Sequence, residues 1–159
     1  MRDRDTEFLD ELANRLERDP ADMDGTLERI LEQLGCATGT IHRLGPAGQL
    51  ELVAQRGLPD QLLPRVQSIP IGKGMAGLAA QRREPVQVCN LQTDCSGSAQ
   101  PAARMTGMGG SIAVPVLAGD ELCGVLGVAT AAAHEFSPEE IAFLNRIAVR
   151  LAQRLRREP

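Results

Sequence analysis

The chain has 159 residues, the length of one domain that can bury a substantial core. Its formal net charge of −4 argues against a surface that binds nucleic acid over the whole molecule. The sequence contains neither Trp nor Tyr, so the aromatic platforms on which nucleobases usually stack are missing. No apolar run reaches the roughly 20 residues of a membrane-spanning helix, so we expect no membrane contact.

Four cysteines occur without a Cys-x-x-Cys pair, and no signal peptide precedes them: Cys36, Cys89, Cys95 and Cys123. This pattern is typical of a reduced, cytoplasmic protein rather than of a disulfide framework. Cys89 and Cys123 fall at strand positions, where we expect small buried side chains. Cys95 lies in a Gly- and Ser-rich segment and is expected to be exposed. Because Cys89 and Cys95 lack further obvious ligands, no metal site is expected.

Residues 1–19 predict an amphipathic helix that ends at Asp19-Pro20. Because this helix is long, acidic and precedes the folded core, we treat residues 1–21 as a separate segment that contributes to a homodimer contact. A second helix follows, capped by Asp22 or Asp24 and ended by Gly35. The apolar stripe of the first helix consists of Phe8, Leu9, Leu12, Ala13 and Leu16.

Short strands and turns are expected in the next part of the chain. Residues 38–43 and 50–56 predict two strands that a hairpin joins at residues 45–48. A helical turn is expected over residues 60–67, and a short strand over residues 68–71.

Residues 72–77, Gly-Lys-Gly-Met-Ala-Gly, match the pattern GxGxxG of dinucleotide-binding folds. Those folds need a full strand before the glycines and an acidic residue at the end of the next strand. Here the preceding strand is short and contains Pro70, and the next strand, over residues 85–89, ends at Asn90. We therefore interpret the glycines as a sharp turn into a short helix that packs closely on a sheet.

Residues 89–109 are the least regular part of the sequence, and only residues 101–105 predict a helical turn there. A connection of this length in a compact domain is typical of a lid or a binding loop.

Residues 110–130 predict the central hairpin, with Gly119-Asp120 as a two-residue turn. Both faces of its strands are apolar, so the sheet has to be covered on both sides. Gly124 and Gly127 leave gaps where a backbone, a helix or a ligand can approach closely. One face of the first strand carries Ile112, Val114 and Val116, and the other carries Ala113, Pro115 and Leu117.

The last predicted helix begins with a capping box formed by Ser137 and Glu140, with Pro138 at its first position. We interpret the arginines of this helix as a solvated face, suited to the negative end of the helix dipole, rather than as a nucleic-acid site. The acidic first helix and the basic last helix are expected to attract each other, within one chain or between two chains. The arginines are Arg146, Arg150, Arg154, Arg156 and Arg157.

Five segments resemble the motifs of the GAF domain family, in the same order. They are Ile-Pro-Ile-Gly-Lys-Gly-Met-Ala-Gly-Leu-Ala, Pro-Val-Gln-Val-Cys-Asn, Ser-Ile-Ala-Val-Pro-Val, Leu-Cys-Gly-Val-Leu-Gly-Val and Phe-Ser-Pro-Glu-Glu. The resemblance covers residues 22–157. It implies an α+β, PAS-related fold with an antiparallel sheet of five or six strands. The terminal helices would cover one face, and short helices and loops would roof a pocket on the other.

The resemblance also implies a sensory or regulatory module that binds a small molecule or holds a dimer together. One branch of the family reduces free methionine sulfoxide with cysteine chemistry. That branch carries a cysteine where this chain has Met75-Ala76, and another where it has residues 102–105, Ala-Ala-Arg-Met. It also carries an Asp-x-Asp pair where this chain has Gly127 and Ala129. We therefore expect no enzymatic activity.

The sequence does not identify a cofactor. The Asn-Lys-x-Asp-Glu signature of cyclic-nucleotide binding is absent. A haem would need an axial ligand: His42 on a strand is the inward-facing candidate, whereas His134 near a turn is expected in solvent. A bilin would need Cys89 or Cys95 together with aromatic packing, and the chain has only three Phe. A redox switch between Cys89 and Cys95 remains an open alternative.

We expect the ligand pocket between the central hairpin and residues 89–109. Small side chains of the sheet would leave space for a ligand, and Arg43 and Arg104 would pair with an anionic one. A slip of the hairpin register by one residue would exchange the face toward the pocket with the face toward the helices. The alternatives to a small-molecule sensor are a ligand-free dimerisation scaffold, a free methionine-(R)-sulfoxide reductase and a thiol redox sensor. The residues expected at the pocket are Arg43, Asn90, Cys95, Arg104, Met105, Met108, Ser111, Ala113, Gly127 and Ala129.

Overall fold

The computed structural model describes residues 3–94, 96–99 and 101–156. The helices are α1 (Asp3–Arg18), α2 (Met23–Leu34), α3 (Leu63–Val66), α4 (Gly74–Arg82) and α5 (Pro138–Arg156), with the 3₁₀ helices η1 (Asp60–Leu62) and η2 (Pro101–Thr106). The strands are β1 (Thr38–Leu44), β2 (Gln49–Arg56), β3 (Ser68–Pro70), β4 (Val86–Val88), β5 (Ser111–Ala118) and β6 (Glu121–Ala129).

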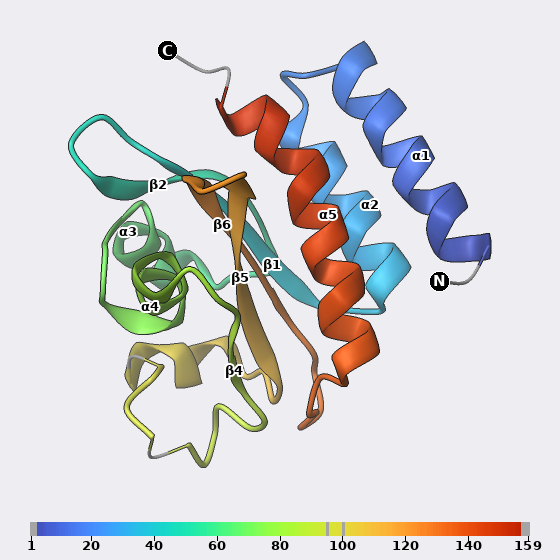
Figure 1. The fold of residues 1–159 in the computed structure, drawn as a ribbon. Helices are drawn as coiled ribbons and strands as arrows, with labels where there is room; N and C mark the ends of the chain where they lie inside the picture. Colours follow the sequence, from blue (N-terminus) through green and yellow to red (C-terminus); the bar gives the residue numbers. More distant parts are fainter. Residues whose placement is uncertain (1–2, 95, 100, 157–159) are drawn as a thin grey trace.

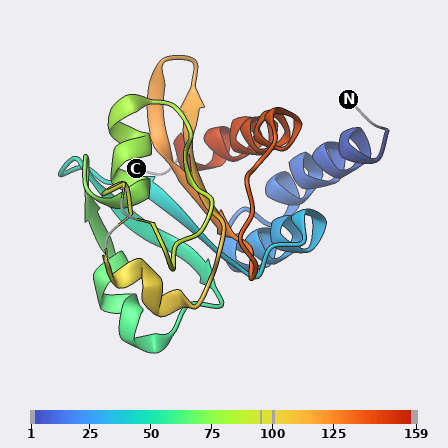
Figure 2. The same cartoon turned by 90° about the horizontal axis from the view of Figure 1, so that it is seen from below.

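A single antiparallel sheet of six strands forms the centre of the fold, in the order β3-β2-β1-β6-β5-β4. Helices α1, α2 and α5 lie on one side of this sheet, and α3, α4 and η2 lie on the other (Figure 1). The view from below shows the same three layers (Figure 2). The predicted α+β architecture, with a sheet covered on both faces, is confirmed.

The central hairpin of β5 and β6 has the predicted two-residue turn. Ala118 pairs with Glu121, and Gly119 adopts a φ of +61°, which a glycine adopts without steric cost. The register shifts next to Val116, where Cys123 is the extra residue of a bulge that the sequence did not predict. Because the bulge lies near the turn, the predicted alternation of faces holds along the rest of the hairpin.

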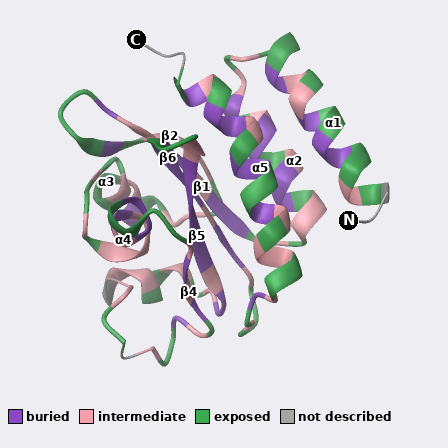
Figure 3. Cartoon of the chain, viewed as in Figure 1, coloured by how far each residue is buried: buried purple, intermediate pink, exposed green. Residues whose placement is uncertain are grey.

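The larger core lies between the sheet and the three helices α1, α2 and α5. Figure 3 shows the buried inner faces of α2 and α5 turned toward the sheet. Burying these side chains removes apolar surface from water, which is the main favourable contribution to folding. The largest fully buried side chains of this layer are Leu9, Leu12, Leu27, Ile30, Ile41, Ile112, Leu126, Leu144, Ile147 and Leu151.

The apolar stripe of α1 is buried within its own chain. Phe8 and Leu9 are 3% and 1% exposed, and the Phe8 ring meets Phe143 of α5 edge-on at 6.0 Å. An ion pair between Glu11 and Arg29, with N···O of 3.0 Å, joins α1 to α2. The acidic and basic terminal helices therefore lie side by side within one chain, and a second copy has access only to their outer faces.

The predicted helix caps are present. The Asp22 carboxylate accepts a hydrogen bond from the Gly25 amide at 2.9 Å, and Gly35 ends α2 with a φ of +70°. At α5, the Ser137 amide donates to Glu140 at 2.8 Å, and the Glu140 amide donates to Ser137 Oγ at 3.1 Å.

The glycine-rich turn leads into α4 as predicted, within an antiparallel sheet rather than a parallel nucleotide-binding one. A Cβ on Gly77 would lie 2.6 Å from the Pro70 carbonyl oxygen, so only glycine permits this close packing of α4 against β3. None of the described helices is long and apolar enough to cross a membrane.

Candidate functional site

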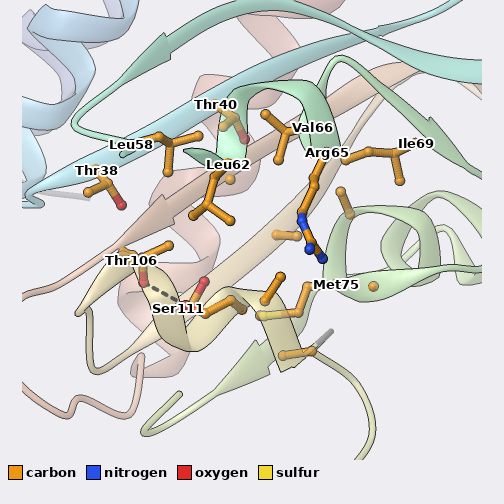
Figure 4. Close-up of a pocket in the computed structure, with 18 of the residues that line it drawn as sticks. Thr38, Thr40, Leu58, Leu62, Arg65, Val66, Ile69, Met75, Thr106 and Ser111 are labelled. Carbon is orange, nitrogen blue, oxygen red and sulfur yellow. Dashed lines mark hydrogen bonds between the residues drawn. The ribbon is translucent and has the colours of Figure 1, made fainter. Parts of the chain in front are cut away.

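A cavity of about 430 Å³ lies on the face of the sheet opposite α5, with β1, β5 and β6 on one side and α3, α4 and η2 around the other (Figure 4). This volume is in the usual range of small-molecule sites. The main lining residues are Thr38, Thr40, His42, Leu58, Leu62, Arg65, Val66, Ile69, Lys73, Met75, Ala76, Leu91, Ala102, Ala103, Thr106, Ser111, Ala113, Gly127 and Ala129.

The floor of the cavity is made of small side chains on paired strands. Ser111 pairs with Ala129, and Ala113 pairs with Gly127, so two adjacent pairs of small residues face the same space. Thr40, on the neighbouring strand β1, pairs with Gly127. A Cβ added to Gly127 would lie 3.0 Å from the Thr40 Oγ1. The gap that Gly127 leaves is thus part of the floor, whereas Gly124 faces α5 and the backbone of β1.

The walls and roof come from segments that lie far apart in the sequence. Leu58, Leu62 and Val66 enter from the segment that contains η1 and α3, and Met75 enters from the first turn of α4 (Figure 4). The roof residues of η2 are Ala102, Ala103 and Thr106. The Thr106 hydroxyl donates to the Ala103 carbonyl at 2.8 Å, so its side chain also closes the turn of η2.

His42 of β1 forms a buried polar part of the wall. The side chain is 1% exposed, and its Nε2 lies 2.8 Å from the carbonyl oxygen of Val66 in α3. Burial lowers the pKa of His42 below its ordinary value, and the hydrogen bond to Val66 opposes that shift. The ring is therefore neutral at pH 7, with Nε2–H as the donor to Val66. Within the described residues, Nδ1 is buried without a hydrogen-bond partner.

Four of the residues predicted for the pocket line this cavity: Ser111, Ala113, Gly127 and Ala129. Their role in binding a ligand stays a prediction. They face the cavity because alternate side chains of a strand point to the same side, and the bulge near the turn leaves this part of the hairpin in register.

Five other predicted residues are absent from the lining. Arg43 lies next to His42 on β1, so strand alternation turns it toward the helix face. In η2, the residues Ala102, Ala103 and Thr106 turn inward, so Arg104 and Met105 point outward, and the Arg104 guanidinium donates to the Asp94 carbonyl at 3.1 Å. The remaining two are Asn90, whose Oδ1 accepts from the Gln92 amide, and Met108, whose carbonyl accepts from the Gln92 side chain.

Cys95, the tenth predicted residue, lies outside the described part of the chain. The expectation that Cys89 is buried was wrong: β4 ends at Val88, so Cys89 follows the strand and is exposed. Cys123 is buried as predicted, at 4% exposure. Of the three described cysteines, none lines the cavity.

Sequence reasoning missed the cations of the cavity, Arg65 and Lys73, and the apolar wall of η1 and α3. The spacing of Leu58, Leu62 and Val66 was a local signal for one inward-facing side of a helical segment. Nothing in the order of residues indicated that this segment folds over the central hairpin. The sequence indicates His42 only as a candidate haem ligand, not as part of the wall of this cavity.

Comparisons with known proteins agree with this architecture. Residues 20–156 match the sequence profile described as "GAF domain". No curated protein matches the sequence. Among solved structures, the GAF domain of a phosphoenolpyruvate-protein phosphotransferase from Coxiella burnetii is similar, with a TM-score of 0.80 and 21% identity over 96% of this chain and 92% of that one.

Two further structures show the range of proteins that share this fold. The GAF domain of the Acinetobacter phosphoenolpyruvate-protein phosphotransferase has a TM-score of 0.79 and 20% identity, over 98% of this chain and 95% of that one. Free methionine-R-sulfoxide reductase from Neisseria meningitidis, solved with its substrate, has a TM-score of 0.75 and 18% identity, over 98% and 92% of the two chains. At these identities the likeness concerns the fold alone.

Proposed function

Because this chain belongs to the GAF domain family, we propose that it is a non-enzymatic sensory or regulatory module that binds a small molecule in the cavity above β1, β5 and β6. The observation that carries the proposal is the cavity itself. It is large enough for a metabolite, mainly apolar, and furnished with a few polar groups such as Thr40, His42 and Ser111.

A ligand is favoured over a ligand-free scaffold by the space that remains between the sheet and the elements facing it. The small residues of the floor are consistent with a filled interior, but here η2 and α3 stand away from them and leave about 430 Å³. Close packing is the rule in protein interiors, so a space of this size is an exception that binding would explain. A ligand would join the sheet to α3, α4 and η2, and this contact would carry the signal.

A sensor is also favoured over a reductase by the chemistry of the cavity. The resemblance places the cysteines of the reductase branch at Met75-Ala76 and within residues 102–105, none of which is a cysteine here. Of these positions, Met75, Ala76, Ala102 and Ala103 line the cavity. Gly127 and Ala129, at the Asp-x-Asp positions, offer no carboxylate. A redox step on methionine sulfoxide needs a thiolate at the substrate, and the described lining residues supply none.

Dimerisation through the terminal helices remains part of the proposal. Since the apolar stripe of α1 is buried within the chain, a second copy would meet the outer faces of α1 and α5. The outer face of α1 is acidic, with Glu7, Asp10 and Glu11, while α5 presents Arg146 beside Val149, which is 55% exposed. Opposite charges around an exposed apolar side chain favour a symmetric contact of α1 with α5 of the other copy.

Native mass spectrometry of freshly purified protein, followed by thermal-shift screening of a metabolite panel, tests the binding proposal. We expect a retained mass or a stabilising compound. The matched variants are Ala102→Phe, which adds a ring to the roof of the cavity, and Met105→Phe, which adds one to the outward side of the same 3₁₀ helix, where Met105 is 43% exposed. Binding should be lost in the first variant and kept in the second.

Repeated absence of a retained ligand, with no thermal shift across the panel, would favour the scaffold. Turnover of free methionine sulfoxide with a thiol reductant would overturn the non-enzymatic assignment.

A further inference from the structure

The charged residues that line the cavity are all cations. Arg65 of α3 and Lys73 at the start of α4 belong to the lining, and no Asp or Glu does among the described lining residues. Neither cation has an ion pair or a side-chain hydrogen bond with another described residue. Other cations of the described chain do have partners, such as Arg29 with Glu11 and Arg56 with Glu28.

The two cations lie at the rim of the cavity. Figure 4 shows the Arg65 side chain directed from α3 into the space that Met75 faces. Arg65 and Lys73 are both exposed overall, and both residues contribute to the lining. A guanidinium at such a position can bind a carboxylate or a phosphate through two parallel hydrogen bonds.

The start of α4 adds backbone donors to the same region. Lys73 is the N-cap residue of this nine-residue helix, and no side chain caps the amides that follow it. The next residues, Gly74, Met75 and Ala76, line the cavity. The first amides of a helix lack partners within the helix and lie at the positive end of its dipole, where they favour an anion.

An independent observation comes from His42 in the wall of the cavity. Its side chain is 1% exposed, and Nδ1 has no hydrogen-bond partner within the described residues. A buried polar atom without a partner is costly, and a donor would remove that cost only where the wall moves enough for it to reach Nδ1. Because the ring is neutral, it adds polarity to the wall without adding charge.

Building on the proposed function, we propose that the cavity selects small molecules that combine an apolar body with one anionic group, a carboxylate or a phosphate. The anionic group would lie between Arg65, Lys73 and the first amides of α4. The apolar body would occupy the space between Leu62, Val66 and the small residues of β5 and β6. The anion-binding role expected for Arg43 and Arg104 thus passes to two other cations.

Matched probe pairs test this selection. We would measure dissociation constants by calorimetry for a panel of arylalkyl carboxylates and phosphate monoesters, each next to its neutral amide or alcohol, for example 4-phenylbutyrate and 4-phenylbutyramide. The variants are Arg65→Gln and Lys73→Gln. The control is Arg82→Gln, which removes an exposed cation from the other end of α4 outside the cavity.

The expected result is that anionic probes bind about tenfold more tightly than their neutral partners, because hydrogen bonds to a charged group are worth more than neutral ones. Arg65→Gln and Lys73→Gln should each weaken the anionic probes by about tenfold and leave the neutral ones unchanged, while Arg82→Gln changes neither. Comparing the two anionic arms separates carboxylate from phosphate recognition.

Equal affinity of anionic and neutral probes, or indifference of the anionic probes to Arg65→Gln and Lys73→Gln, would overturn the inference. If anionic and neutral probes bind equally well and both lose binding in Ala102→Phe, the cavity is still a binding site. Only the proposed selectivity for anions is then wrong. If no probe of either kind binds and no ligand is retained after purification, the proposed function fails with it.

Discussion

Nε2 of His42 lies 2.8 Å from the carbonyl oxygen of Val66 and joins the centre of the sheet to α3 at the wall of the cavity. Helix α3 has only four residues, too few to be stable alone, so its position depends on such tertiary contacts. The hydrogen bond therefore helps to hold α3 against the sheet at the wall of the cavity.

Burial of the His42 ring predicts a loss of stability in mild acid. Burial lowers the pKa of His42 in the folded protein. When the pH falls below about 6.5, the ordinary pKa of histidine, the unfolded chain therefore takes up a proton more readily than the folded chain does. Stability from this group is complete above that value and declines as pH falls from 7 toward 5. Urea unfolding at several pH values measures the effect.

The matched variants for this measurement are His42→Gln, which retains a donor for Val66 without titrating, and His134→Gln, which removes the half-buried imidazole that pairs with Glu140. The decline between pH 7 and 5 should flatten in His42→Gln and persist in His134→Gln. An unchanged decline in His42→Gln would contradict the assignment.

The described cysteines should differ in reactivity. Burial, with a smaller contribution from Glu140, raises the pKa of Cys36 to about 11, two units above the reference value of 9.0. At pH 8 its thiolate fraction is then roughly a hundredfold below that of an unperturbed thiol. Peptide mapping after timed alkylation should show rapid labelling of exposed Cys89 and slow labelling of Cys36 and buried Cys123, with equal labelling in denaturant. Rapid labelling of Cys36 in the native protein would contradict this.

Two glycines of β6 should respond differently to the same substitution. A Cβ on Gly124 would collide with the backbone carbonyl of His42 and would also lie 3.0 Å from Leu155 of α5. A Cβ on Gly127 would meet only the Thr40 hydroxyl at 3.0 Å, which a side-chain rotation relieves. Gly124→Ala should cost about 1–3 kcal/mol of unfolding free energy or more, and Gly127→Ala less than about 1 kcal/mol. Similar costs in chemical denaturation would show that the backbone approach of β1 is not the constraint.

The proposed dimer contact predicts sensitivity to charge and salt. Arg146→Glu and Val149→Asp, both on the outer face of α5, should each weaken self-association by about tenfold. Added salt should also weaken the self-association of the unmodified protein. Light scattering coupled to size exclusion gives the mass, and Arg82→Glu on α4 is the control. A protein that is monomeric at all concentrations, or a dimer indifferent to both variants, would contradict this contact.

Local patterns predicted most of the elements because their causes are local. Asp22 and Gly35 bound α2, Ser137 and Glu140 begin α5, and Gly119-Asp120 turns the hairpin, all through interactions within a few residues of the chain. The four floor residues were predicted correctly because side chains along a strand alternate between the two faces of the sheet. The two-residue turn fixes the register, and so it decides which residues share a face. The bulge at Cys123 left no comparable local sign.

The sequence by itself thus determined a sheet that is apolar on both faces, its central hairpin, its capped terminal helices and its family. Only the tertiary structure decided which cations reach the cavity, that α1 buries its stripe in its own chain, and that His42 meets Val66. The contact of His42 with Val66 joins residues 24 positions apart, and the other two features likewise depend on elements that meet only in the folded chain. Their free energy depends on how the layers pack together, which no short stretch of sequence encodes.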